Sequence, residues 1–189
     1  MGVQSRRSLI RSSLLAAGTG IVWPRASDAG LAVQTREKLA VTALITAYYP
    51  VSHADVIVSK ILEGYQRNNQ PPGPGLKLVS MYVDQLHAHD MSQAMADRYG
   101  VRLCRSIDEA ISLGTDNVQV AGVLSIGEHG DYPRREVTQQ KMYPRRRFFD
   151  ETVATFRRCG RCVPYFNDKH LSDRWDDAVQ MVRMSREMG

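Results

Sequence analysis

Four apolar runs along this chain each end in a compact cluster of polar side chains. The runs are short and rich in β-branched residues, which is typical of buried strands. All five histidines lie in or beside the clusters. Because ligands of open α/β sheets bind outside the carboxyl ends of the strands, the pattern predicts a site at one edge of a parallel sheet. The runs and their clusters are 39–47 with Tyr48, Tyr49 and His53; 76–83 with Asp84, His87 and His89; 120–126 with Glu128, His129 and Asp131; and 162–166 with Asn167, Asp168, Lys169 and His170.

Segments with helical periodicity alternate with these strands. Such alternation implies right-handed crossovers and a parallel sheet. We therefore expect an α/β fold: a Rossmann-like, doubly wound parallel sheet with helices on both faces, forming a single domain over residues 38–189. The predicted strands are 38–47, 77–83, 101–104, 122–126 and 162–166. The first predicted helix follows a capping box at 52–55 and ends before residue 68. The other predicted helices are 92–99, the segment from Ser106 to Gly114, 145–158, and a last helix that begins after a cap at Ser172.

Composition favours one globular domain and argues against a nucleic-acid partner. The chain has 189 residues, of which 43% are hydrophobic and 24% charged, so it can bury a core of its own. Its formal net charge is +5, but Arg6, Arg7, Arg11 and Arg25 against Asp28 contribute +3 of this within the first 29 residues. The remaining +2 is too small to indicate a nucleic-acid surface.

The first residues predict an export signal. The string 5–10 (SRRSLI) is typical of the twin-arginine motif, and a modest apolar stretch at 14–23 precedes small residues near Ala26 and Ala29. We expect a twin-arginine signal peptide at 1–29, a linker at 30–37, and a periplasmic or cell-envelope location. The apolar stretch is too short for a stable membrane anchor. The alternative is a disordered basic tail.

The cysteines and the long loop 127–144 carry weaker signals. Cys159 and Cys162 have the spacing of a redox pair or half a zinc site, but Gly160 between them indicates the end of a helix. Two similar strings repeat here, 132–136 (YPRRE) and 143–147 (YPRRR). Those arginines would either clamp an anionic ligand or pair with neighbouring acids, and the second role is the commoner one.

Four stretches occur in an order and spacing found in one enzyme family. They are 79–84, a strand ending in an acid; 94–101 (AMADRYGV) leading to 106–109 (SIDE); 117–129, a strand ending near His129; and 160–171, in which Asp168 and Lys169 precede a helix. Together they resemble the N-terminal domain of the glucose-fructose oxidoreductase/inositol dehydrogenase (Gfo/Idh/MocA) family. The resemblance covers most of residues 38–189.

This resemblance implies an NAD(P)-dependent oxidoreductase that acts on a sugar or polyol-type hydroxyl of a small molecule. By the family's motifs, Asp84 would bind the adenosine ribose, and Lys169 would approach the nicotinamide and the substrate hydroxyl. We expect His129 and His170 to assist Lys169 in catalysis. The other expected cofactor-binding residues are Tyr48, His53, Glu128 and Asp168.

The turn after the first strand departs from the family pattern. Residues 46–53 contain no glycine, whereas the family has G-x-G-x-x-G, whose glycines let the backbone approach the pyrophosphate. Tyr48 and Tyr49 would crowd that position, and Pro50 lacks an N–H donor. His170 replaces the family's proline, and the chain ends where the family continues, so we expect part of a larger or truncated enzyme.

Two further hypotheses remain open. The first is a site for a divalent metal, because imidazole and carboxylate ligands at strand ends suit zinc, manganese or iron; its ligands would come from His53, Asp84, His129, Asp131 and His170. The second is a non-catalytic exported binding module. Homo-oligomers are compatible with all three hypotheses.

Overall fold

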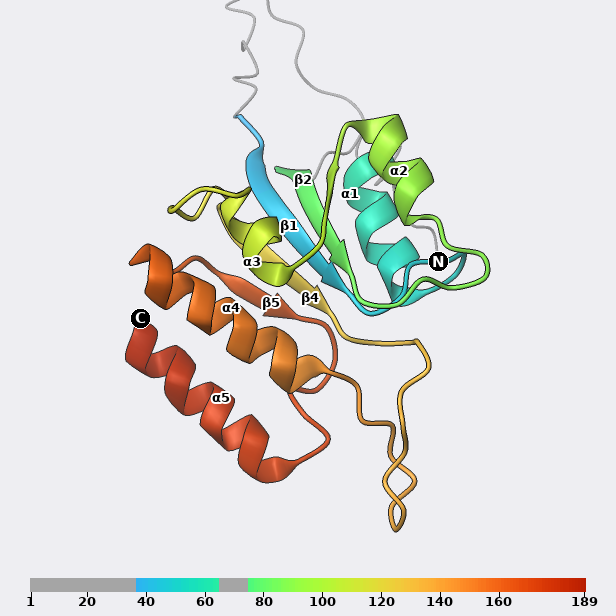
Figure 1. Cartoon of the computed structure of the whole chain (residues 1–189), viewed down its shortest axis with the longest axis vertical. Coiled ribbons are helices and arrows are strands. Elements are labelled where there is room, and N and C mark those ends of the chain that lie inside the picture. The colour runs from blue at the N-terminus through green and yellow to red at the C-terminus, as the bar shows by residue number, and fades with distance from the viewer. Residues whose placement is uncertain (1–36, 65–74) are drawn as a thin grey trace, which may run out of the picture. The chain divides into compact units, whose positions relative to one another are not determined.

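Five parallel strands form the centre of the fold. The computed structural model describes residues 37–64 and 75–189, so the predicted signal peptide and residues 30–36 of the linker lie outside the described residues. The strands lie in the order β3-β2-β1-β4-β5, and every neighbouring pair is parallel (Figure 1). The sheet confirms the predicted α/β, Rossmann-like class. Its strands are β1 (Leu39–Ile45), β2 (Leu76–Val83), β3 (Arg102–Cys104), β4 (Gly122–Ile126) and β5 (Tyr165–Asn167).

The helices cover both faces of this sheet, as predicted. On one face, Val58, Met95 and Ala96 pack against Val41 and Ile45 of β1. On the other face, α3 and α4 pack against Leu44, because alternate residues of a strand point to opposite faces. The helical elements are η1, a π-helical segment (Asp55–Ser59), which continues into α1 (Lys60–Glu63); α2 (Ser92–Tyr99); α3 (Ile107–Ser112); α4 (Arg145–Cys159); and α5 (Trp175–Met188).

The last helix packs on α4 through a small separate core. Met181 of α5 contacts the cluster that contains Phe149 and Val153 of α4. Consequently α5 lies beside α4 in Figure 1. In the described parts of the chain, 37–64 and 75–189, no helix combines the length and the apolar character needed to cross a membrane.

Several predicted boundaries are right and two are wrong. The bounds of α2 and β4 agree with the prediction, and Gly160 ends α4 with φ 66°. Ser172 does not cap α5: its Oγ accepts a hydrogen bond from the Arg174 N–H, and the helix begins at Trp175. The strand predicted at 162–166 is shorter and later, Tyr165–Asn167. Residues 65–67 of the first predicted helix lie outside the described residues.

Candidate functional site

The strand-end loops converge where the order of the sheet reverses, between β1 and β4. The Thr46 N–H donates a hydrogen bond to the Ile126 carbonyl at 3.2 Å, which continues the backbone hydrogen bonding between β1 and β4. The Thr46 hydroxyl also donates to the Glu128 carbonyl. The Asp168 N–H bonds the Ser125 carbonyl at 2.9 Å, which continues the ladder from β5 to β4. These bonds hold the ends of three adjacent strands together. In doubly wound sheets this reversal point is where ligands bind.

His53 and Asp168 form a hydrogen-bonded pair across this point. His53 follows β1 and Asp168 follows β5, and the imidazole Nδ1 lies 2.8 Å from the carboxylate Oδ2. An ionised carboxylate only accepts hydrogen bonds, so Nδ1 carries the hydrogen of this bond. The side chains are 31% and 15% exposed, so the pair is half-buried but accessible from solvent.

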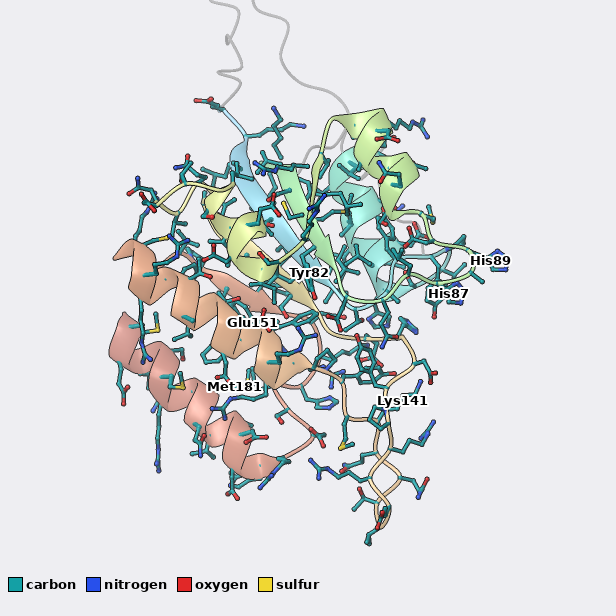
Figure 2. All side chains as sticks on the ribbon, viewed as in Figure 1. Tyr82, His87, His89, Lys141, Glu151 and Met181 are labelled. Carbon is teal, nitrogen blue, oxygen red and sulfur yellow. The ribbon has the colours of Figure 1, made fainter. Side chains whose placement is uncertain are left out.

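A row of rings extends from this pair. The His129 ring centroid lies 5.2 Å from that of His53 and 5.5 Å from that of Tyr49. Tyr49 stacks on His87 at 4.0 Å, and His89 lies further out on the same exposed loop (Figure 2). The structure therefore brings His53, His129 and Asp168 together at one edge, as the sequence pattern predicted.

The backbone is strained at two of the site residues. His129 and Lys169 adopt φ 72° and 75°, the left-handed region that side chains with a Cβ atom rarely occupy. The Asn167 amide holds the second turn by bonding the carbonyls of Lys169 and His170, each at 3.2 Å. Strained residues that the surrounding structure holds in place are concentrated at functional sites, which supports this edge as the site.

His129 is held in its neutral form. Burial lowers its pKa first, and the positive charges of His53, Lys141 and Lys169 lower it further, against the opposing charge of Glu128. Its Nε2 is buried and has no hydrogen-bond partner among the described residues. A neutral imidazole with one uncommitted nitrogen can accept a proton or a hydrogen bond from a bound molecule.

Glu128 and His170 are both hydrogen-bonded to one buried arginine. Arg145, whose side chain is 1% exposed, donates to Glu128 Oε2 at 2.5 Å and contacts His170 Nε2 at 2.8 Å. Because a guanidinium only donates hydrogen bonds, His170 Nε2 accepts and its hydrogen lies on Nδ1. Burial and the Arg145 charge lower the pKa of His170. The Tyr143 ring lies 4.9 Å from the same guanidinium.

Asp84, the expected ribose-binding acid, is also hydrogen-bonded to side chains of the protein. Its carboxylate accepts hydrogen bonds from Tyr82 and Tyr132, both at 2.6 Å, and from Arg147 at 2.5 Å. Burial alone would raise the pKa of Asp84, but these three donors outweigh it and hold the pKa below its ordinary value. A ribose hydroxyl would have to compete with three existing donors.

The start of the first helix does not fit a dinucleotide in the standard pose. The Asp55 carboxylate accepts the Val51 N–H at 2.8 Å, and Ser52 Oγ accepts the N–H groups of Asp55 and Tyr49. Three backbone donors of this turn, those of Tyr49, Val51 and Asp55, are therefore satisfied by the chain itself. The ionised Asp55 would also repel the phosphates. Val51 adopts φ 66° without being a glycine.

Tyr48 lies in the core and not among the strand-end side chains, which corrects its expected role. Its side chain is fully buried, and its hydroxyl pairs with Ser59 at 3.0 Å. Burial raises its pKa to about 12. Only Tyr49 of the two tyrosines is placed to crowd the turn. Residues just after a strand have no fixed periodicity, so the sequence pattern could not tell the two apart.

The divalent-metal hypothesis is not supported. Within residues 37–64 and 75–189, no group of three or more histidine, cysteine, aspartate or glutamate side chains is arranged to hold a metal ion. Three of the five expected ligands bind other side chains: His53 binds Asp168, His170 binds Arg145, and Asp84 binds Arg147.

Sequence reasoning missed Arg145 and Arg147 as organisers of the site. The commoner role expected for the loop arginines, pairing with acids, is confirmed for Arg135 with Asp173 and for both of these residues. One signal could have found them: the three arginines 145–147 directly follow a proline at the start of a helix.

Comparison with known proteins adds little to this geometry. No protein-family model matches the chain, and no curated protein matches it in sequence. Biliverdin reductase from Synechocystis sp. PCC 6803, in a crystal structure with biliverdin and NADP⁺, is similar with a TM-score of 0.48 and 15% identity, covering 80% of this chain. The chain spans 35% of that protein's length. This likeness is too distant to say anything about activity.

Proposed function

We propose that this domain carries the acid–base site of an enzyme that acts on a small polar molecule. His53 would move a proton to or from a hydroxyl or carbonyl oxygen, and Asp168 would fix the tautomer and orientation of its ring. The observation that carries this proposal is the 2.8 Å pair between His53 Nδ1 and Asp168 at the reversal point of the sheet. Imidazole is the side chain most often used for general acid–base catalysis.

The neighbours of this pair suit the same chemistry. His129 offers a second, neutral imidazole 5.2 Å from His53, measured between ring centroids. Lys169 lies next to Asp168 in the chain, and its positive charge acts on His129. An amine at that position would stabilise negative charge that develops on a substrate oxygen during proton transfer.

A second candidate function is an NAD(P)-dependent oxidoreductase acting on a sugar or polyol-type hydroxyl. The strand order β3-β2-β1-β4-β5 favours it, because dinucleotides bind at the reversal point of such sheets. The Asp55 contact with the Val51 N–H opposes the standard pose. We therefore assign no step of the reaction to a nicotinamide.

Turnover assays with the full chain test the proposal. A panel of sugars, polyols and their keto forms would be incubated with the protein, with and without NAD(P)⁺ and NAD(P)H, and followed by NMR. We expect His53→Ala to slow any turnover by about 10²–10⁴-fold, the usual contribution of a general acid–base group. His89→Ala, which changes an exposed histidine that does not contact His53 or Asp168, is the matched control.

The pattern of turnover separates the two candidates. Consumption without a nicotinamide supports the acid–base enzyme, whereas consumption only with one supports the oxidoreductase. Turnover by His53→Ala at the wild-type rate would remove His53 from the mechanism.

We also propose that the protein acts in the cell envelope. The twin-arginine string at 5–10 supports this location. Fractionation of expressing cells, with Arg6→Lys and Arg7→Lys as the export-deficient variant, tests it.

A further inference from the structure

We propose that the hydrogen bond between His170 and Arg145 is an acid-sensitive contact that holds the loop after β5, and with it Asp168, in the position that the acid–base pair needs. A proton on His170 would break this contact and release the loop. This inference rests on the proposed function, because it names how the His53–Asp168 site is regulated.

The contact exists only while His170 is neutral. Arg145 Nη1 lies 2.8 Å from His170 Nε2, and a guanidinium has donors but no acceptor, so Nε2 accepts this hydrogen bond with its lone pair. A second proton on the imidazole would occupy Nε2. Two N–H groups and two positive charges would then face each other, so that repulsion replaces the hydrogen bond.

Arg145 stays with the loop after β4 when this contact breaks. Its side chain is 1% exposed and donates to Glu128 Oε2 at 2.5 Å. Its stem also packs on Gly127, where an added Cβ would lie 2.6 Å from Arg145 Cγ. His170, by contrast, is exposed as a whole residue, so its ring can move into solvent. The loop after β5 is therefore the part that is released.

Release of His170 would reach Asp168 through the turn between them. The Asp168 N–H donates to a β4 carbonyl at 2.9 Å, and the His170 ring is bonded to α4 through Arg145. Lys169 lies between these two bonds with φ 75°. A strained residue keeps such a conformation only when the surrounding structure over-determines it. Without the bond to α4, Lys169 can relax and turn the Asp168 carboxylate away from His53.

Hydrogen bonds within the turn do not replace the lost contact. The Asn167 amide bonds the carbonyls of Lys169 and His170, each at 3.2 Å. Asn167 is the last residue of β5 itself, so these bonds make no link to α4. The contact with Arg145 is what connects the turn to that helix.

The charged groups that face His170 set the pH at which the contact breaks. They are Arg145 of α4, Glu128 after β4, and Asp173 before α5. Partial burial of the ring lowers its pKa most, and the Arg145 charge lowers it further, against the two carboxylates. Both carboxylates are paired, Glu128 with Arg145 and Asp173 with Arg135. The contact is therefore intact at neutral pH and breaks at a pH below 6.5, the ordinary pKa of histidine.

The test is NMR of the ¹⁵N-labelled full chain from about pH 8 to about pH 5, the range around the ordinary pKa of histidine. The His170 ring resonances give the midpoint of its own titration. Below that midpoint, we expect the protection of the Asp168 N–H against hydrogen exchange to fall by at least about tenfold, which corresponds to one lost hydrogen bond to a charged group. We also expect the His53 ring to show a second inflection at the same pH, besides its own titration.

Two variants of His170 separate this contact from other effects of acid. His170→Gln keeps an acceptor, because the amide oxygen reaches about as far as imidazole Nε2, but it does not titrate. The Asp168 N–H should then stay protected at low pH, and the second inflection of His53 should disappear. His170→Ala has no acceptor, so the Asp168 N–H should be poorly protected at every pH. His89→Gln, which changes an exposed histidine of the loop after β2, is the matched control and should behave as wild type.

Equal protection of the Asp168 N–H in wild type and His170→Gln at every pH would overturn the inference, and so would a His53 ring without the second inflection. These readouts do not depend on turnover, so the two proposals fail separately. If the contact does not respond to pH while His53→Ala slows turnover, the acid–base site stands without this regulation. If the contact responds but His53→Ala turns over at the wild-type rate, the proposed function fails, and with it the regulatory role of His170.

Discussion

Replacing Arg145 with alanine is expected to lower the free energy of unfolding by about 3–5 kcal/mol, the range seen when one partner of a buried ion pair is removed. The guanidinium is 1% exposed and holds Glu128 and His170 at once. Without it, the Glu128 carboxylate stays in a half-buried position without its charge partner. The Arg145 stem also packs on Gly127, where an added Cβ would lie 2.6 Å from Arg145 Cγ, so the deletion leaves a void.

Urea unfolding at neutral pH measures this effect. Arg157→Ala removes an exposed arginine from the same helix and should change the free energy of unfolding by less than about 0.5 kcal/mol. Adding Glu128→Gln to Arg145→Ala should restore part of the loss, because the unpaired charge is then gone. A loss below 1 kcal/mol for Arg145→Ala would show that this cluster does not hold the site together.

Replacing Asp84 with asparagine is expected to lower the free energy of unfolding at pH 7 by about 1.5–3 kcal/mol, the range for hydrogen bonds to a charged group. The folded state holds the pKa of Asp84 below its ordinary value of 3.8. The resulting stabilisation is complete above pH 3.8 and is lost as the pH falls through the lower pKa of the folded state. The difference between the two proteins should therefore shrink below about pH 4.

Unfolding followed as a function of pH measures this second effect. Asp116→Asn changes a fully exposed acid and serves as the control, with little expected effect at any pH. A difference between wild type and Asp84→Asn that stays constant from pH 7 to pH 3 would contradict the assigned charge on Asp84.

The sequence could predict the architecture because it depends on local patterns. Alternating strands and helices imply a doubly wound sheet, and the polar residues after each strand then have to meet at one edge. His53 and Asp168 lie 115 residues apart in the chain, yet both follow a strand, and the structure pairs them at 2.8 Å. The sequence also showed that residues 46–53 contain no glycine. In the structure, Asp55 accepts the Val51 N–H and Ser52 accepts the Asp55 N–H at this turn.

The partners of the charged residues could not be predicted, because they depend on tertiary distances. In the sequence, Asp84 and Lys169 are equivalent kinds of position, because each is a charged residue just after a strand. The structure engages Asp84 with Arg147 and two tyrosines, whereas Lys169 has no carboxylate partner in the described part of the chain. Of these partners, Tyr132 and Arg147 come from the loop 127–144 and the start of α4, whose path over the sheet no local pattern fixes, whereas Tyr82 lies on β2.

The most direct test of the central claim is ¹⁵N NMR of the His53 ring in the full chain at a pH where the ring is neutral. We expect Nδ1 to carry the hydrogen, and Asp168→Ala to shift the population towards the Nε2–H tautomer, which free histidine prefers. A wild-type ring that already carries its hydrogen on Nε2, or a tautomer indifferent to Asp168→Ala, would contradict the proposed acid–base pair.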